Sequence, residues 1–193
     1  MADDVSDTTQ PLAEDSILAL QADEVHLKAM KQSACRAKAD GIIKANVVQA
    51  MTMGLIPVPL LDIVALTNIQ FKMVDDLVKL YGIHYTHVEK SVVRSFVLGA
   101  LPVVAVTGLS SALKVIPGIG SFVGSAGVAV SAGGLTYATG GVFAHHFEAG
   151  GNLNDFDMRA AKQQFMKEFR HGKKAAHQQI SKPPLLSTQK IPD

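Results

Sequence analysis

Apolar positions recur with helical spacing along most of the chain, and this pattern predicts helices. A weak apolar stripe from Ser16 to Gln32 predicts an otherwise polar helix. Gly41 is expected to interrupt the helical pattern after this stripe. An apolar helix continues from Ile42 to Ile56. The next apolar repeat has intervals of three and four residues and consists of Ile63, Leu66, Gln70, Met73, Leu77 and Leu80. We therefore expect amphipathic helices over residues 16–94.

Local signals mark where the second of these helices begins and ends. Pro57 and Pro59 form a rigid corner, and the second proline suits the first turn of a helix. Asp62 then falls in that first turn, where a carboxylate interacts favourably with the helix dipole. Tyr81 and Gly82 supply the C-terminal end with its glycine.

Two further polar positions are informative. Gln70 interrupts the apolar seam, and we interpret it as a satisfied core amide that fixes the register of the helix, in preference to a ligand contact. Thr86 and Glu89 have the spacing of a capping box, so a third helix is predicted to start there. It runs directly into the least charged part of the chain.

Residues 95–147 carry a single formal charge, Lys114, and ten of the 16 glycines. Two uncharged runs flank a turn at Pro117 and Gly118, which predicts a hydrophobic helical hairpin over these residues. Small residues, among them Gly120 and Gly124, would let two helix backbones approach closely.

The hairpin is open to two interpretations, of which we favour the first. Its first arm has 19 uncharged residues and would be about 28 Å long, close to the thickness of a hydrocarbon core. Basic residues on both flanks would then place both ends of the hairpin in the cytoplasm and Lys114 across the membrane. Alternatively, the Gly-, Ala- and Ser-rich second arm is only modestly hydrophobic, and the hairpin is buried within a helical bundle.

A basic amphipathic helix is predicted over residues 152–178, capped by Asn154 or Asp155. Met158, Ala161, Phe165 and Phe169 share one face, and most of the basic residues lie on other faces. Such a helix lies on an anionic bilayer surface or docks on the bundle with its charges in water, and we favour the second. Residues 1–15, which are acidic, and residues 179–193 are expected to be disordered tails.

Composition narrows the class of protein. Of 193 residues, 48% are hydrophobic and 18% charged, with a mean hydropathy of +0.21, so association with a membrane has to be considered. A net charge of +1 gives no overall field for holding nucleic acid. A single cysteine, Cys35, excludes an internal disulfide framework.

Searches for catalytic patterns fail. The glycine-rich run from Gly118 to Gly124 lacks the third glycine of a dinucleotide fingerprint and a preceding strand, and no P-loop motif occurs. His145, His146 and Glu148 have no second pair to complete a metal site, since adjacent histidines on a helix point about 100° apart. We expect no catalytic residue, no metal site, no cofactor and no enzymatic activity.

Several separated motifs carry a resemblance to a known family. They are Gly54–Asp62, Ile69–Met73, Lys79–Ile83, Leu113–Gly120, Thr136–Gly140 and Phe147–Gly150, in this order, within a region of similarity from about Ala39 to Lys174. This region resembles domain of unknown function family 697, a bacterial domain that commonly follows the GTPase domain of Era-like GTPases and is related to YcjF-type membrane proteins. The resemblance implies an all-helical, membrane-associated module that works beside a GTPase. We expect any nucleotide chemistry to come from a separate partner.

Taken together, these patterns predict an all-α fold, a single helical domain over residues 16–178 with a central Gly-rich hydrophobic hairpin. We expect a non-enzymatic protein of the bacterial inner membrane with cytoplasmic termini, whose cytoplasmic helices recruit or regulate a partner, an Era-like GTPase. Membrane lipid and a second copy of the chain in a homo-oligomer are further expected partners. A pore-forming hairpin and a wholly soluble helical interaction module are the alternatives.

Overall fold

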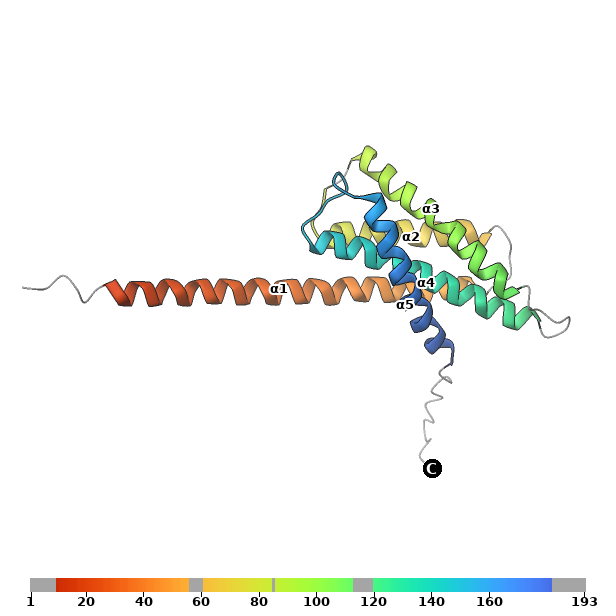
Figure 1. The fold of residues 1–193 in the computed structure, drawn as a ribbon, viewed down its shortest axis with the longest axis horizontal. Coiled ribbons are helices and arrows are strands. Elements are labelled where there is room, and N and C mark those ends of the chain that lie inside the picture. Colours follow the sequence, from red (N-terminus) through yellow and green to blue (C-terminus); the bar gives the residue numbers. More distant parts are fainter. Residues whose placement is uncertain (1–9, 56–60, 85, 113–119, 182–193) are drawn as a thin grey trace, which may run out of the picture.

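The computed structural model describes residues 10–55, 61–84, 86–112 and 120–181, and these residues form five helices and no strand (Figure 1). The predicted all-α class is confirmed. The helices are α1 (Gln10–Met53), α2 (Leu61–Leu80), α3 (His87–Ala112), α4 (Gly120–Glu148) and α5 (Met158–Ser181).

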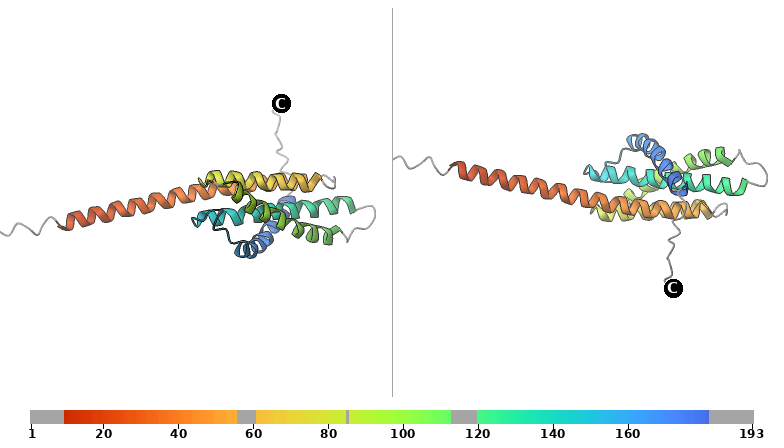
Figure 2. Two further views of the ribbon diagram at one scale, coloured as in Figure 1. Left: turned by 90° about the horizontal axis from the view of Figure 1, so that it is seen from above. Right: turned by 90° about the horizontal axis from the view of Figure 1, so that it is seen from below.

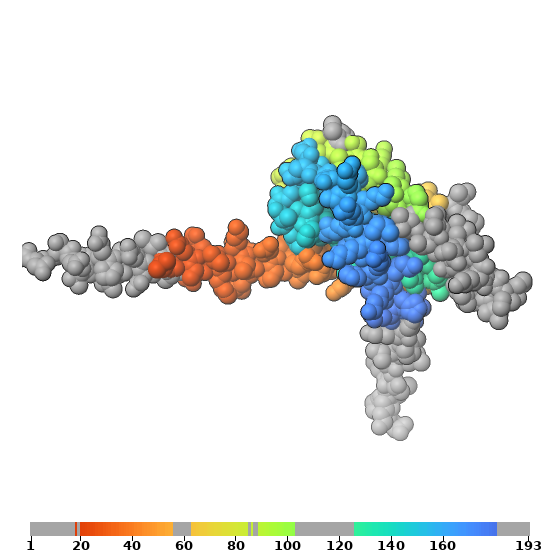
Figure 3. All heavy atoms as spheres, in the orientation of Figure 1, coloured from red at the N-terminus to blue at the C-terminus, as the bar shows by residue number. Residues whose placement is uncertain are grey.

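The first helix is longer than predicted. It begins at Gln10, inside the expected acidic tail, and runs without interruption through Gly41. The prediction that Gly41 interrupts the helix is therefore wrong. A glycine inside a helix costs only about 1 kcal/mol of stability relative to alanine, and the packing of neighbouring turns can offset this cost. The described side chains of residues 18–34 are exposed, and this part of α1, which we call the arm, projects from the bundle (Figures 1 and 3).

Glycines end α2 and α4 in the same manner. Gly82 has a φ of 67°, and beside it the Ile83 amide donates to the Val78 carbonyl at 2.9 Å. Gly150 has a φ of 84°, and the following amide donates to the His146 carbonyl at 3.0 Å. These six-to-one bonds across a left-handed residue satisfy carbonyls that the helix end leaves open. The predicted stop at Gly82 is confirmed.

The start of α3 has the predicted capping-box contact, whereas the cap of α5 is a different residue from the two that were predicted. The Glu89 carboxylate accepts a hydrogen bond from the Thr86 amide, as a capping box requires. At α5 the cap is Asp157, whose carboxylate accepts from the Arg159 amide at 2.8 Å, and not Asn154 or Asp155. Asp155 instead accepts from the Asn152 amide at 2.7 Å and so holds the preceding loop.

The central element is α4, which packs against each of the other four helices. In Figure 2, α1 and α2 lie on one side of it and α5 on the other, while α3 runs beside it. The hairpin partners α3 and α4 pack against each other, and the segment that joins them, 113–119, is outside the described residues. From residue 129 to 144, nearly every side chain of α4 is buried.

Small residues on α4 allow neighbouring helices to approach closely. A Cβ atom on Gly54, just after α1, would lie 2.8 Å from the Ala129 Cα atom of α4. On the other side, a Cβ atom on Gly172 of α5 would lie 3.0 Å from the Gly134 carbonyl oxygen. Because the backbones themselves meet at these points, only glycine fits there without a shift.

An aromatic cluster closes the opposite end of the bundle. Phe96 of α3 lies edge-on to Phe143 of α4 at 5.3 Å and to Phe165 of α5 at 5.9 Å between ring centroids. Phe156, in the loop before α5, stacks on Phe143 at 4.9 Å. Such ring pairs add about 0.5–1.5 kcal/mol each to simple burial.

Within the described ranges, no helix is both long enough and apolar enough to cross a bilayer. The transmembrane helix that our preferred reading of the hairpin required is not found in this part of the chain. The fully buried positions of α4, including Leu135, Thr136, Ala138 and Phe143, face other helices of the bundle. For residues 126–148 the buried-hairpin interpretation describes the structure.

Two glycine substitutions test the close approach of α1 and α4. We expect Gly54→Ala to lower the free energy of unfolding by about 1–3 kcal/mol, because the new methyl group meets the backbone of Ala129. Gly41→Ala is the matched control: nothing lies within 4 Å of that position, so better helix propensity should raise stability by about 0.5–1 kcal/mol. Urea unfolding followed by circular dichroism measures both, and equal effects would contradict the packing described.

Candidate functional site

The C-terminal helix α5 has two chemically different faces. One face is buried against the bundle and carries Ala161, Phe165, Phe169 and Ala176. This arrangement matches the preferred prediction for α5, in which its apolar face docks on the bundle. Most of the basic side chains of α5 are exposed, whereas Lys173 lies over the Phe169 ring.

The outward face of α5 is strongly basic. Its exposed cations, which we call the basic face, are Arg159, Lys162, Lys167, Arg170 and Lys174. Met166 is 38% exposed and lies one helical turn from both Lys162 and Arg170. Figure 3 shows α5 at the surface of the bundle. A basic face with an exposed thioether at its middle suits an anionic, partly apolar surface such as lipid headgroups.

An apolar groove adjoins the basic face, between α3 and α5. It has a volume of about 270 Å³, and Phe96 and Phe165, both buried, lie among its lining residues. Met158 and Met166 line it from α5, together with Lys162. A group with an apolar part and a negative charge would find both of its complements here.

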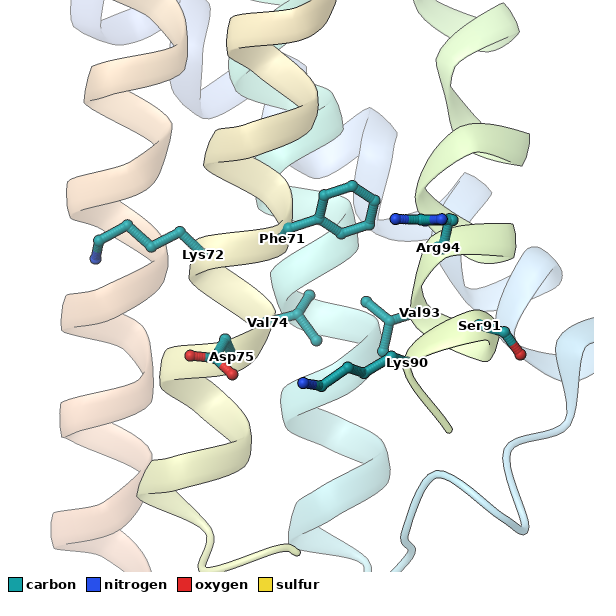
Figure 4. Close-up of a pocket in the computed structure, with 8 residues that line it drawn as sticks. All are labelled: Phe71, Lys72, Val74, Asp75, Lys90, Ser91, Val93 and Arg94. Atoms are coloured by element: carbon teal, nitrogen blue, oxygen red, sulfur yellow. The ribbon is translucent and has the colours of Figure 1, made fainter. Parts of the chain in front are cut away.

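A larger cleft of about 610 Å³ lies between α2 and α3 (Figure 4). Phe71 and Val74 line it from α2, and Val93 and Arg94 from α3. In Figure 4 the Arg94 side chain extends toward Phe71, whereas Lys72 points away from the cleft. Lys72 is paired with Asp76 at 2.7 Å on its own helix. The cleft therefore offers an aromatic ring and a guanidinium group on facing helices.

A polar cluster joins three elements where the arm leaves the bundle. Arg36 of α1 forms an ion pair with Glu148, the last residue of α4. The Tyr81 hydroxyl, just after α2, donates to the other carboxylate oxygen of Glu148 at 2.8 Å. Burial, together with this hydrogen bond, raises the pKa of Tyr81 above its ordinary value, so the hydroxyl keeps its proton at physiological pH. The cluster holds the base of the arm in place.

A second polar pair lies inside the core. The amide nitrogen of Gln70 donates to the hydroxyl of Thr136 at 3.3 Å, and both side chains are fully buried. Among the described residues, the Gln70 side-chain oxygen and the Thr139 hydroxyl have no hydrogen-bond partner. Gln70 thus lies in the core as predicted, but only its donor is satisfied.

The other predicted site residues lie far apart in the fold and do not form one site. Asp62 lies in the first turn of α2, Gly120 is the first residue of α4, and Gly124 follows one turn later. Of the remaining predicted positions, Tyr81 belongs to the polar cluster and Gly82 ends α2. The following predicted residues lie outside the described part of the chain: Pro57, Pro59, Lys114, Pro117 and Gly118.

No constellation typical of catalysis gathers in the described ranges. There, no group of three or more His, Cys, Asp and Glu side chains is placed to hold a metal ion. His146 bonds the Asn152 carbonyl at 2.7 Å and the Asp155 carboxylate at 3.1 Å, so it fastens the loop before α5. No pattern in the sequence predicts the Arg36–Glu148 pair, because its members are 112 residues apart.

Comparison with known proteins places the chain in a family. The profile of a family described as a domain of unknown function, DUF697, matches residues 20–174. A relative, magnetosome membrane protein 22 from Magnetospirillum gryphiswaldense (strain MSR-1), is 34% identical over 140 residues, which are 72% of each chain. No solved structure matches.

The fold and the family match together define an all-α class of helical modules. The chain belongs to the DUF697 family, which confirms the resemblance found in its sequence motifs.

The half-satisfied amide in the core leads to a stability prediction. We expect Gln70→Met to keep the free energy of unfolding within about 1 kcal/mol of wild type or to raise it, because a buried oxygen without a partner is removed at nearly constant volume. Gln70→Ala, which leaves a cavity, should lower it by about 2–4 kcal/mol. A loss above about 2 kcal/mol for the methionine variant would mean that the oxygen has a partner, such as a buried water.

Proposed function

We propose that this protein is a non-enzymatic, membrane-associated helical module that brings a partner protein to a membrane surface. The observation that carries the membrane part of this proposal is the 34% identity to a protein named as a membrane protein, over 72% of both chains. Membership of the DUF697 family supports it.

In our proposal, the basic face of α5 makes the contact with lipid. Each Lys or Arg held near an anionic membrane surface contributes about 1 kcal/mol of attraction, so five cations give a substantial affinity. Met166 and the apolar groove beside it would take up part of a lipid molecule. Contact of this kind keeps both termini on one side of the membrane, which we propose is the cytoplasmic face of the bacterial inner membrane.

The partner would bind in the cleft between α2 and α3. This cleft and the groove between α3 and α5 share no lining residue, so a partner in the cleft and a lipid in the groove would contact different residues of α3. Two α2 side chains, Ile63 and Val64, are 55% and 59% exposed and provide further apolar surface on α2. We propose an Era-like GTPase as the partner, on the strength of the resemblance between the sequence motifs and GTPase-associated domains.

The lipid contact is tested with charge reversals on α5. We expect Lys162→Glu combined with Arg170→Glu to lower affinity for phosphatidylglycerol-containing vesicles at least about tenfold, because two attractions become repulsions. The matched control, Lys38→Glu with Lys44→Glu, changes the net charge equally on exposed positions of α1. Vesicle co-sedimentation measures both pairs, with pure phosphatidylcholine as the neutral reference. Equal losses for the two double variants would contradict a membrane contact through α5.

The partner contact is tested with purified proteins. We expect an Era-like GTPase from the same organism to bind more tightly in one nucleotide state than in the other, and Arg94→Glu in the cleft to weaken this binding. Lys44→Glu, on an exposed position of α1 outside the cleft, is the control. Calorimetry that detects no binding in either nucleotide state would refute the GTPase assignment and leave the lipid contact standing.

A further inference from the structure

The arm of α1 presents apolar side chains to water along its whole length. Leu18, Leu20, Val25, Leu27 and Met30 are between 52% and 69% exposed. Along the chain, Ala39 is the first position of α1 with a fully buried side chain among those described. An isolated helix of this length is only marginally stable in water, and exposed leucines add a cost that a partner would remove.

The apolar residues of the arm form two lines on opposite faces. One line contains Leu18, Ala22, Val25 and Ala29 and continues, turn by turn, into the face that α1 buries in the bundle. The other contains Leu20, Leu27 and Ala34, which are seven residues apart. Seven residues make two turns of a helix that packs along another, so these three residues stay on one face, with one apolar position in each heptad.

The charges of the arm change sign along its length. Asp23 and Glu24 lie toward the outer end, and Lys28 and Lys31 lie closer to the bundle, all of them exposed. Two arms packed side by side in parallel would bring like charges together at both places. Packed antiparallel about Leu27, the acidic pair of each copy lies opposite residues 30 and 31 of the other, so it comes close to Lys31, with Lys28 one turn away.

The same arrangement suits the length of the arm. When Leu27 of one chain lies opposite Leu27 of the other, Leu20 of each chain lies opposite Ala34 of its partner. Asp23 of each chain then lies at the same height as Lys31 of its partner. This overlap of 15 residues spans about 22 Å of helix and brings the two bundles to opposite ends of the contact. A parallel pair would instead crowd both bundles at one end.

We propose that two copies of this chain associate through their arms, antiparallel, with the two-fold axis close to Leu27. The interface is formed by the line of Leu20, Leu27 and Ala34 and is flanked by two sets of complementary charges, related by the two-fold axis. This proposal does not depend on the lipid contact or on the partner discussed above.

Single cysteines test the orientation. In a Cys35→Ser background, we expect Leu27→Cys to form an intermolecular disulfide rapidly under mild oxidation. Val25→Cys is the matched control, since Val25 is at least as exposed as Leu27, at 69% against 52%, but lies on the opposite face. A mixture of Leu20→Cys and Ala34→Cys chains should give mostly the mixed dimer. Equal cross-linking at positions 25 and 27, or preferred self-pairing of Leu20→Cys, would overturn the proposal.

Charge exchange tests the interface without new covalent bonds. We expect Asp23→Lys with Glu24→Lys, and separately Lys28→Glu with Lys31→Glu, to weaken self-association at least about tenfold. An equimolar mixture of the two variants should associate like wild type, because every contact is again between opposite charges. Sedimentation equilibrium measures this, and circular dichroism checks that each variant is folded. A monomeric wild type, or an arm that is protected from proteolysis only by lipid vesicles, would refute the dimer.

Discussion

The structure depends on the burial of one helix on all sides. Because α4 consists largely of Gly, Ala, Ser and Thr, it has no broad polar face to turn toward water, and each of the other helices must cover part of it. Because the side chains of α4 are small, the backbones of the covering helices come close to it. Close backbone packing then supplies the dispersion contacts that larger side chains would otherwise make. The positions of α1, α2, α3 and α5 follow from this requirement.

Predictions were reliable where the structural feature depends on contacts between residues close together in the chain. Gly82 ends α2 because only a residue without a Cβ atom adopts its left-handed φ without cost, and Glu89 caps α3 through a contact three residues away. Gly41, by contrast, was predicted to interrupt a helix and does not. It is not among the glycines with a left-handed φ, and the helix continues through it. At Gly41 the next turn is anchored by Ile43, which is buried.

Features that depend on contacts across the fold were harder to predict. A scarcity of charge in residues 95–147 is equally compatible with lipid and with the interior of a bundle, and the sequence alone does not distinguish these surroundings. Similarly, the basic face of α5 was visible in its periodicity, but the groove beside it requires α3, which is distant in sequence. The Arg36–Glu148 pair also requires the folded chain.

The Arg36–Glu148 pair has a mechanical consequence, since it links α1 to the bundle at the base of the arm. From Arg36 to Gln10 the helix extends about 39 Å, so a tilt of about 10° at its base moves the tip by about 7 Å. The Arg36 side chain is 52% exposed, and the strength of its ion pair therefore falls as salt screens it. Added salt is therefore expected to loosen this link, whereas the apolar packing around α4 does not depend on paired charges.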